Sequence, residues 1–164
     1  LLFPLGIPLL LAVLLPRADA WIGWTAWNGG AAQAAAAAAL IAAGGTVALW
    51  TILAQMTRAS GTPFPMAPTR ALLTDGPFAL CRNPMSLGTI LAYFGVALWT
   101  GSPASMAAVL LFAALLLLYI RRIEEKELAL RFGEPYLRYK ASTPFLLPWP
   151  RPRGNPPASD SESG

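Results

Sequence analysis

The chain alternates long apolar stretches with shorter polar ones, and this pattern predicts membrane-spanning helices. The apolar stretches cover residues 1–15, 31–55, 85–100 and 104–120. As a helix rising about 1.5 Å per residue, the second stretch is long enough to cross a hydrocarbon core of about 30 Å. Only Gly101, Ser102 and Pro103 separate the last two, which should form a tight antiparallel hairpin. Gly44 and Gly45 should let the second span pack closely against a neighbour.

The first stretch contains Pro4 and Pro8 and suits either a spanning helix or a signal-peptide core. No small-residue cleavage pattern precedes Trp21, so we interpret the stretch as a truncated first span. The connector that follows carries Trp21, Trp24 and Trp27 at a spacing of three, as expected of amphipathic rings at the headgroup level. A stacked aromatic ligand site is the alternative interpretation.

Composition supports the membrane class, because 55% of the residues are hydrophobic and only 12% are charged, against about a quarter in soluble proteins. Of the basic residues, three lie in 56–84, eight lie from Arg121 onward, and only Arg17 lies in the first connector. The positive-inside rule then places the 56–84 loop and the C-terminal region together on the cytoplasmic side, and both termini inside. The basic balance therefore reflects topology, and we expect no nucleic-acid partner.

Titratable chemistry is restricted, because the chain has no histidine and one cysteine. Zinc sites, imidazole bases and internal disulfides are excluded, and we expect no metal. Cys81 has no nearby base to activate it, so we interpret it as a packing residue. Any reaction must depend on carboxylates, arginines, tyrosines, amides or the backbone.

Polar groups suited to binding gather in two segments, 74–88 and 121–148. They read TDGPFALCRNPMSLG and RRIEEKELALRFGEPYLRYKASTPFLLP. The ordered set resembles the integral-membrane methyltransferases that include isoprenylcysteine carboxyl methyltransferase and phospholipid methyltransferases. In that family a G-P-[YF] turn precedes R-[HN]-P-x-Y-x-G, an E-E doublet, F-G-x-x-Y-x-x-Y and a closing Pro. The matching residues are Gly76, Pro77, Phe78, Arg82, Asn83, Pro84, Gly88, Glu124, Glu125, Phe132, Gly133, Tyr136, Tyr139 and Pro148.

The resemblance implies S-adenosylmethionine as cofactor and S-adenosylhomocysteine as product. Arg82, which lies before a helix start, would bind the cofactor carboxylate together with Asn83, since helix N-termini also favour anions. Glu124 or Glu125 would hold the ammonium or the ribose hydroxyls. Three aromatic rings would line the adenine: those of Phe132, Tyr136 and Tyr139. The turn and the helix start would complete the cofactor segment with Gly76, Leu80, Pro84 and Gly88.

Two positions depart from the family pattern. Asn83 stands where many members have His, and Ser86 stands where most have Tyr. An amide hydrogen-bonds but does not titrate near neutral pH, so we expect Asn83 to be a neutral binding group. Arg122 is a candidate for orienting an acceptor carboxylate, and Glu125 is the candidate catalytic carboxylate.

The acidic doublet also has an ordinary interpretation. Arg121 can pair with Glu125 at i,i+4, and Glu127 with Arg131, on a solvated helix face. Successive helical residues lie about 100° apart, so we expect only one of the two doublet carboxylates to face a pocket. Arg82 could likewise be an interfacial anchor, and the tyrosines interfacial aromatics.

The predicted fold is an all-α transmembrane bundle of about four spans with a short cytoplasmic C-terminal helical segment completing a cofactor pocket. One domain covers 1–153, and 154–164 is a disordered tail. The predicted function is methyl transfer to a lipophilic acceptor entering from the bilayer of a prokaryotic inner membrane, among membrane lipids. Prenylated cysteine, a phospholipid amine, a quinone-like lipid and a foreign lipophilic thiol or acid all remain open.

Two other functions compete with methyl transfer. An NADPH-dependent membrane reductase of the sterol reductase type shares the R-[HN]-P turn, but the glutamate doublet after a short hairpin favours methyl transfer. A non-enzymatic four-span scaffold or transporter should carry polar residues lining a path. The spans carry few such residues: Gln33, Thr46, Thr51 and Ser105.

Overall fold

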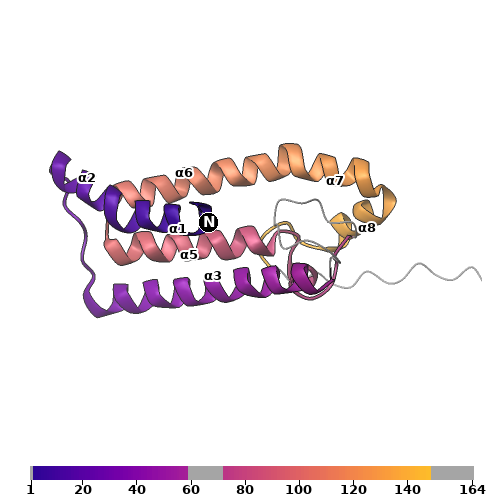
Figure 1. The fold of residues 1–164 in the computed structure, drawn as a ribbon, viewed down its shortest axis with the longest axis horizontal. Coiled ribbons are helices and arrows are strands. Elements are labelled where there is room, and N and C mark those ends of the chain that lie inside the picture. Colours follow the sequence, from indigo (N-terminus) through magenta and orange to yellow (C-terminus); the bar gives the residue numbers. More distant parts are fainter. Residues whose placement is uncertain (1, 59–71, 149–164) are drawn as a thin grey trace, which may run out of the picture.

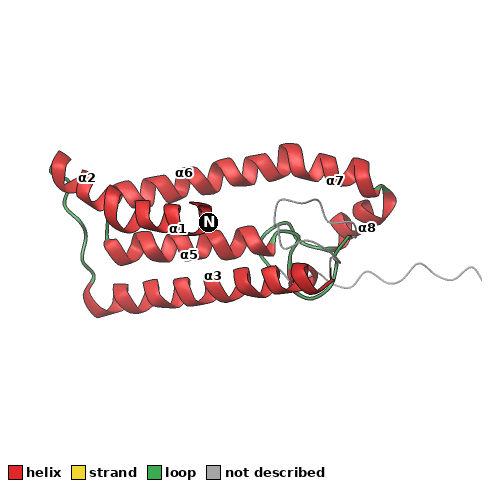
Figure 2. Cartoon of the chain, viewed as in Figure 1, coloured by secondary structure: helices red, strands yellow, loops and turns green. Residues whose placement is uncertain are grey.

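The computed structural model describes residues 2–58 and 72–148, and within these ranges the secondary structure is entirely helical (Figure 2). The all-α prediction is therefore confirmed for the described residues. The elements are α1 Leu2–Leu9, a π-helical turn Leu10–Leu14, α2 Leu15–Ile22, α3 Gly30–Arg58, α4 Pro77–Leu80, α5 Pro84–Thr100, α6 Pro103–Tyr119, a second π-helical turn Ile120–Glu124, α7 Glu125–Phe132 and α8 Glu134–Ser142. The predicted tail at 154–164 lies outside the described residues.

Two described helices are long and apolar enough to cross a membrane. They are Gly30–Thr57 and Pro103–Phe132, the second formed by α6, the π-helical turn and α7 together. Pro84–Thr100 is a shorter apolar helix. The three helices run along one another, with α3 and α6 on either side of α5 (Figure 1).

The N-terminal helical run extends further than the sequence predicted. It continues through α2 to Ile22 and ends where Gly23 adopts φ 82°, a left-handed conformation that favours glycine. The helix continues this far because its last turns carry a buried carboxylate, that of Asp19. Asp19 accepts hydrogen bonds from the Ser102 hydroxyl and from the Ala104 backbone N–H at 3.2 Å, at the start of α6. Unpaired N–H groups at a helix start favour an anion, so this tertiary contact keeps the polar end of α2 helical.

The predicted hairpin between the last two apolar helices is confirmed. Gly101 takes φ 63° after α5, Ser102 caps α6 by accepting from the Ser105 N–H at 3.0 Å, and Pro103 occupies the first turn. Since the chain reverses here, the start of α5 and the end of α6 point to the same end of the bundle. The chain around α4, α7 and α8 gathers at that end (Figure 1).

Glycines set the close approach of α3 and α5. A Cβ on Gly88 would lie 2.7 Å from the Ala48 nitrogen and the Gly44 oxygen, and one on Gly44 would collide with Ala92. The close packing predicted for Gly44 is therefore confirmed. Gly45, by contrast, faces open space, so its predicted packing role is wrong. Successive helical residues lie about 100° apart, so Gly44 and Gly45 lie on different sides of α3, and of the two only Gly44 meets α5.

Candidate functional site

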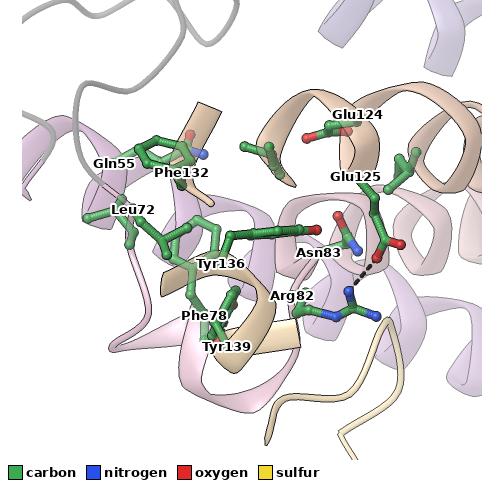
Figure 3. Close-up of a pocket in the computed structure, with 13 residues that line it drawn as sticks. Gln55, Leu72, Phe78, Arg82, Asn83, Glu124, Glu125, Phe132, Tyr136 and Tyr139 are labelled. Atoms are coloured by element: carbon green, nitrogen blue, oxygen red, sulfur yellow. Dashed lines mark hydrogen bonds and ion pairs between the residues drawn. The ribbon is translucent and has the colours of Figure 1, made fainter. Parts of the chain in front are cut away.

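The candidate site lies at the end of the bundle where four segments converge. One wall comes from the turn around α4 and the start of α5. Gly76 begins this wall with φ 58°, and the backbone becomes extended at Cys81 before Pro84 opens α5. Arg82 and Asn83 fall in this short extended stretch. Their position between two helices directs both side chains into the end of the bundle (Figure 3).

The opposite wall carries the acidic doublet. The π-helical turn Ile120–Glu124 joins α6 to α7, and such a turn inserts one residue into the helix and rotates the residues that follow. Both Glu124 and Glu125 line the pocket. The expectation that only one of them would face a pocket is therefore wrong, although it is Glu125 that forms the ion pair with Arg82.

A buried ion-pair network joins these walls. Arg82 Nη1 lies 2.5 Å from Glu125 Oε1 (Figure 3). Lys140 Nζ from α8 lies 2.8 Å from Glu125 Oε2. The side chains of Arg82 and Glu125 are 11% and 9% exposed, whereas that of Lys140 is 42% exposed. Glu125 is therefore not part of a solvated helix face paired with Arg121. It is the junction of three chain segments.

Helix α8 supplies the aromatic side of the site. Gly133, with φ 58°, turns the chain between α7 and α8. The Tyr139 hydroxyl donates to the Phe78 carbonyl at 2.7 Å, and the Tyr136 and Tyr139 ring centroids lie 6.4 Å apart. Both tyrosines are buried, and Tyr136 extends across the pocket towards Glu125 and Asn83 (Figure 3).

Seven of the residues predicted from the sequence line one pocket. They are Arg82, Asn83, Glu124, Glu125, Phe132, Tyr136 and Tyr139. The pocket is completed by residues that sequence reasoning did not assign to the site: Gln55, Leu72, Leu73, Phe78, Ile120 and Leu128. Phe78 belongs to the matched G-P-[YF] turn, and that motif was the available signal. The others are ordinary apolar or helix-end residues that only the fold brings here.

Five predicted site residues do not line the pocket. Pro84 is buried at the start of α5, Gly88 lies in the α3–α5 contact, and Gly76 shapes the turn. Leu80 is half exposed, and Arg122 is exposed beside the doublet.

Asn83 forms a hydrogen bond that the sequence did not reveal. Its Nδ2 donates to the Phe145 carbonyl at 2.9 Å, while the Arg82 backbone N–H donates to the Pro144 carbonyl at 2.9 Å. Cys81 beside them is buried, and burial raises the pKa of its thiol. A raised thiol pKa leaves little thiolate, which agrees with a packing role.

Burial also changes the acidity of groups in the pocket. Desolvation raises the pKa of Glu124, and the negative charges of Glu127 and Glu125 raise it further. Desolvation raises the pKa of the Tyr136 phenol, as does the charge of Glu125, while Arg82 opposes the shift. Within the described chain no basic side chain forms an ion pair with Glu124. No group of histidine, cysteine and acidic residues suited to a metal occurs among the residues described.

The fold and the site define a helical membrane protein with a charged pocket at one end of its bundle. Residues 32–135 match the family model described as phospholipid methyltransferase, and the chain belongs to this family. Family and site together support a membrane methyltransferase.

Two curated relatives are each 35% identical over 77 residues. One is the cobalt-zinc-cadmium resistance protein CzcN of Cupriavidus metallidurans, where the match covers 47% of this chain and 35% of the relative. The other is methanethiol S-methyltransferase 1 of Bradyrhizobium diazoefficiens, where it covers 45% of this chain and 25% of the relative. The chain thus matches about a third or less of each relative's length. No solved structure gives a significant match.

Proposed function

We propose that this protein transfers a methyl group from S-adenosylmethionine to a lipophilic acceptor at the pocket between α4, α7 and α8. The observation that carries the proposal is the buried Arg82–Glu125 pair. It stands beside the carboxylate of Glu124, which has no ion pair with the residues described, and beside an apolar and aromatic wall, in a member of a methyltransferase family.

The residues present fit the cofactor. Arg82 Nη1 and Glu125 Oε1 form an ion pair, but neither of these buried atoms, nor Arg82 Nε, has a hydrogen-bond partner among the described residues. A buried donor without a partner is costly, and an arginine edge suits a carboxylate. Glu125 is already held by Arg82 and Lys140, so Glu124 is the better candidate for the ammonium or ribose hydroxyls. Phe132, Tyr136 and Tyr139 offer flat surfaces for the adenine.

The cofactor supplies a methyl group that its sulfonium has already activated. The chain's own residues then have to orient the acceptor and exclude water, because displacement depends chiefly on alignment at about 3–3.5 Å. Glu125 would act by fixing Arg82. If the acceptor is an amine, a carboxylate has to accept its proton, and Glu124 would do so only where it holds the ribose hydroxyls and not the cofactor ammonium. If the acceptor is a carboxylate, Arg122 would orient it from the edge of the site.

The lipophilic acceptor is supported by the apolar side of the pocket. Leu72, Leu73 and Leu128 face the same space as the charged groups. Such a surface would receive the apolar part of an acceptor from the bilayer, while the polar cofactor enters from the aqueous side. A thiol joins the carboxylate and amine as candidate nucleophiles, because one relative is named a methanethiol methyltransferase.

The topology belongs to the proposal as well. The N-terminal helical run, α3, α5 and α6 would be four spans in a prokaryotic inner membrane, with the pocket facing the cytoplasm. Three of the polar side chains within these helices donate to backbone carbonyls of the bundle. Gln33 Nε2 donates to the Leu98 carbonyl at 2.6 Å, Thr51 to Val47 at 2.8 Å and Ser105 to Leu11 at 2.7 Å. These contacts argue against a transporter.

Ligand binding by the purified protein tests the proposal. Calorimetric titration should detect S-adenosylhomocysteine and no NADPH. Arg82→Ala and Glu125→Gln should each weaken S-adenosylhomocysteine binding by about tenfold or more, because removing one partner leaves a buried charge unpaired. Arg138→Ala and Glu134→Gln are matched controls at exposed positions of α8 and should bind normally. NADPH binding without S-adenosylhomocysteine binding would favour the reductase instead.

A further inference from the structure

The chain after α8 returns to the candidate site and contacts its central arginine. We call residues 143–145 the C-terminal strap. Its Pro144 carbonyl accepts from the Arg82 N–H and its Phe145 carbonyl from Asn83 Nδ2, both at 2.9 Å. The family match ends at residue 135, so the strap lies beyond it.

The Phe145 side chain reaches the same arginine. The Arg82 guanidinium carbon lies 5.6 Å from the centre of the Phe145 ring, and that of Arg121 lies 4.5 Å from it. Arg82 is almost buried, and a cation–π contact is stronger where the cation is removed from water. The contact with Arg121, whose residue is exposed, should be weaker.

Arg82 is therefore held from three directions. Glu125 fixes Nη1, the strap fixes the backbone, and the Phe145 ring lies within cation–π range of the guanidinium. An arginine side chain loses about 2 kcal/mol of rotamer freedom when it is fixed, so each contact that defines its plane lowers the cost of ligand binding. Arg82 lines the candidate pocket, and its buried Nε–H and Nη1 have no hydrogen-bond partner among the described residues, so the guanidinium keeps donor capacity for an anion.

We propose that Phe145 is a positioning residue of the candidate cofactor site. Its ring fixes the plane of the Arg82 guanidinium, so that the donors of this group are held in place for the cofactor carboxylate. This inference rests on the proposed function, because it takes the cofactor role of Arg82 as given.

The test measures S-adenosylhomocysteine affinity in proteins altered at Phe145. Phe145→Leu removes the ring and should weaken binding about 5- to 20-fold, whereas Phe145→Tyr should stay within about twofold. Replacing Phe145 with phenylalanines carrying one, two and three ring fluorines should weaken binding stepwise. Fluorine withdraws charge from the ring face with little change of shape, so a merely structural role would not respond in this graded way.

Phe94→Leu is the matched control, because it removes another half-buried ring that packs on the core of the bundle. It should lower thermal stability without changing affinity. Equal affinity of the wild-type, Phe145→Leu and trifluorinated proteins would overturn the inference. If the wild-type protein binds no S-adenosylhomocysteine, the proposed function itself fails. If Phe145→Leu does not fold, the fluorinated series still decides the question.

Discussion

At the scale of single residues, Glu124 shows how burial prepares a carboxylate for binding. Its pKa is raised above the ordinary 4.5 by desolvation and by the charges of Glu127 and Glu125. The folded protein thus holds the proton more tightly than the unfolded chain does. The resulting cost to stability is absent below the unfolded pKa, grows as pH rises and is complete above the folded pKa.

Glu124→Gln should therefore keep or raise the melting temperature at pH 8, while weakening S-adenosylhomocysteine binding about tenfold. In the wild type, affinity should fall as pH drops through the raised pKa, at a pH above 4.5, because the protonated carboxyl no longer attracts an ammonium. The variant should lack that pH dependence. Calorimetry across pH measures both, and unchanged binding by Glu124→Gln at pH 8 would remove this residue from the site.

At the scale of elements, the α3–α5 contact determines where the pocket walls stand. Gly88 was predicted to bind the cofactor, yet it lies between Gly44 and Ala48. Its influence on the site would act through the placement of α5, whose first turn follows Arg82 and Asn83 directly.

Gly44→Ala should destabilise the folded protein by about 1–3 kcal/mol, because the new methyl group meets the backbone of α5 at Ala92 and Gly88. Gly45→Ala is a closely matched control, since a Cβ there meets nothing within 4 Å. It should be neutral, or stabilising by up to about 1 kcal/mol through helix propensity. Thermal unfolding in detergent compares the two. Equal melting temperatures would show that close packing at Gly44 does not hold α3 and α5 together.

At the scale of the whole molecule, the bundle places the connector at 23–29 and the candidate site at opposite ends (Figure 1). In the proposed topology the site is cytoplasmic and the connector is outside. Thr25 and Leu130 are exposed at these two ends, and Cys81 is buried. A Cys81→Ala background would therefore allow single cysteines to report on each end.

In intact spheroplasts a membrane-impermeant maleimide should modify Thr25→Cys and should reach Leu130→Cys only after permeabilisation. The basic residues near the site favour the cytoplasm, which is the physical reason for this orientation. Inverted vesicles provide the reciprocal control. Labelling of Leu130→Cys, and not of Thr25→Cys, in intact spheroplasts would reverse the proposed topology.

The sequence by itself determined the main apolar helices, the hairpin between the last two of them and most of the polar residues of the candidate site. Uninterrupted apolar stretches predict helices because backbone groups in lipid must be satisfied within the chain, and Gly101, Ser102 and Pro103 encode the hairpin through their turn and cap preferences. The ordered motif also led to residues that share one pocket, including Arg82, Glu125 and Tyr136. These features follow from the order and spacing of residues along the chain, which can be read without knowledge of the fold.

Only the tertiary structure decided which groups meet. The helical course to Ile22 depends on Asp19 reaching α6, and both doublet carboxylates line a pocket because α4 and α8 are packed around them. Neither follows from local propensity. The contact of Phe145 with Arg82 joins residues far apart in the chain, and it exists because the chain after α8 returns to the start of α5. Such pairings depend on how helices pack, and the spacing of residues along the chain does not contain them.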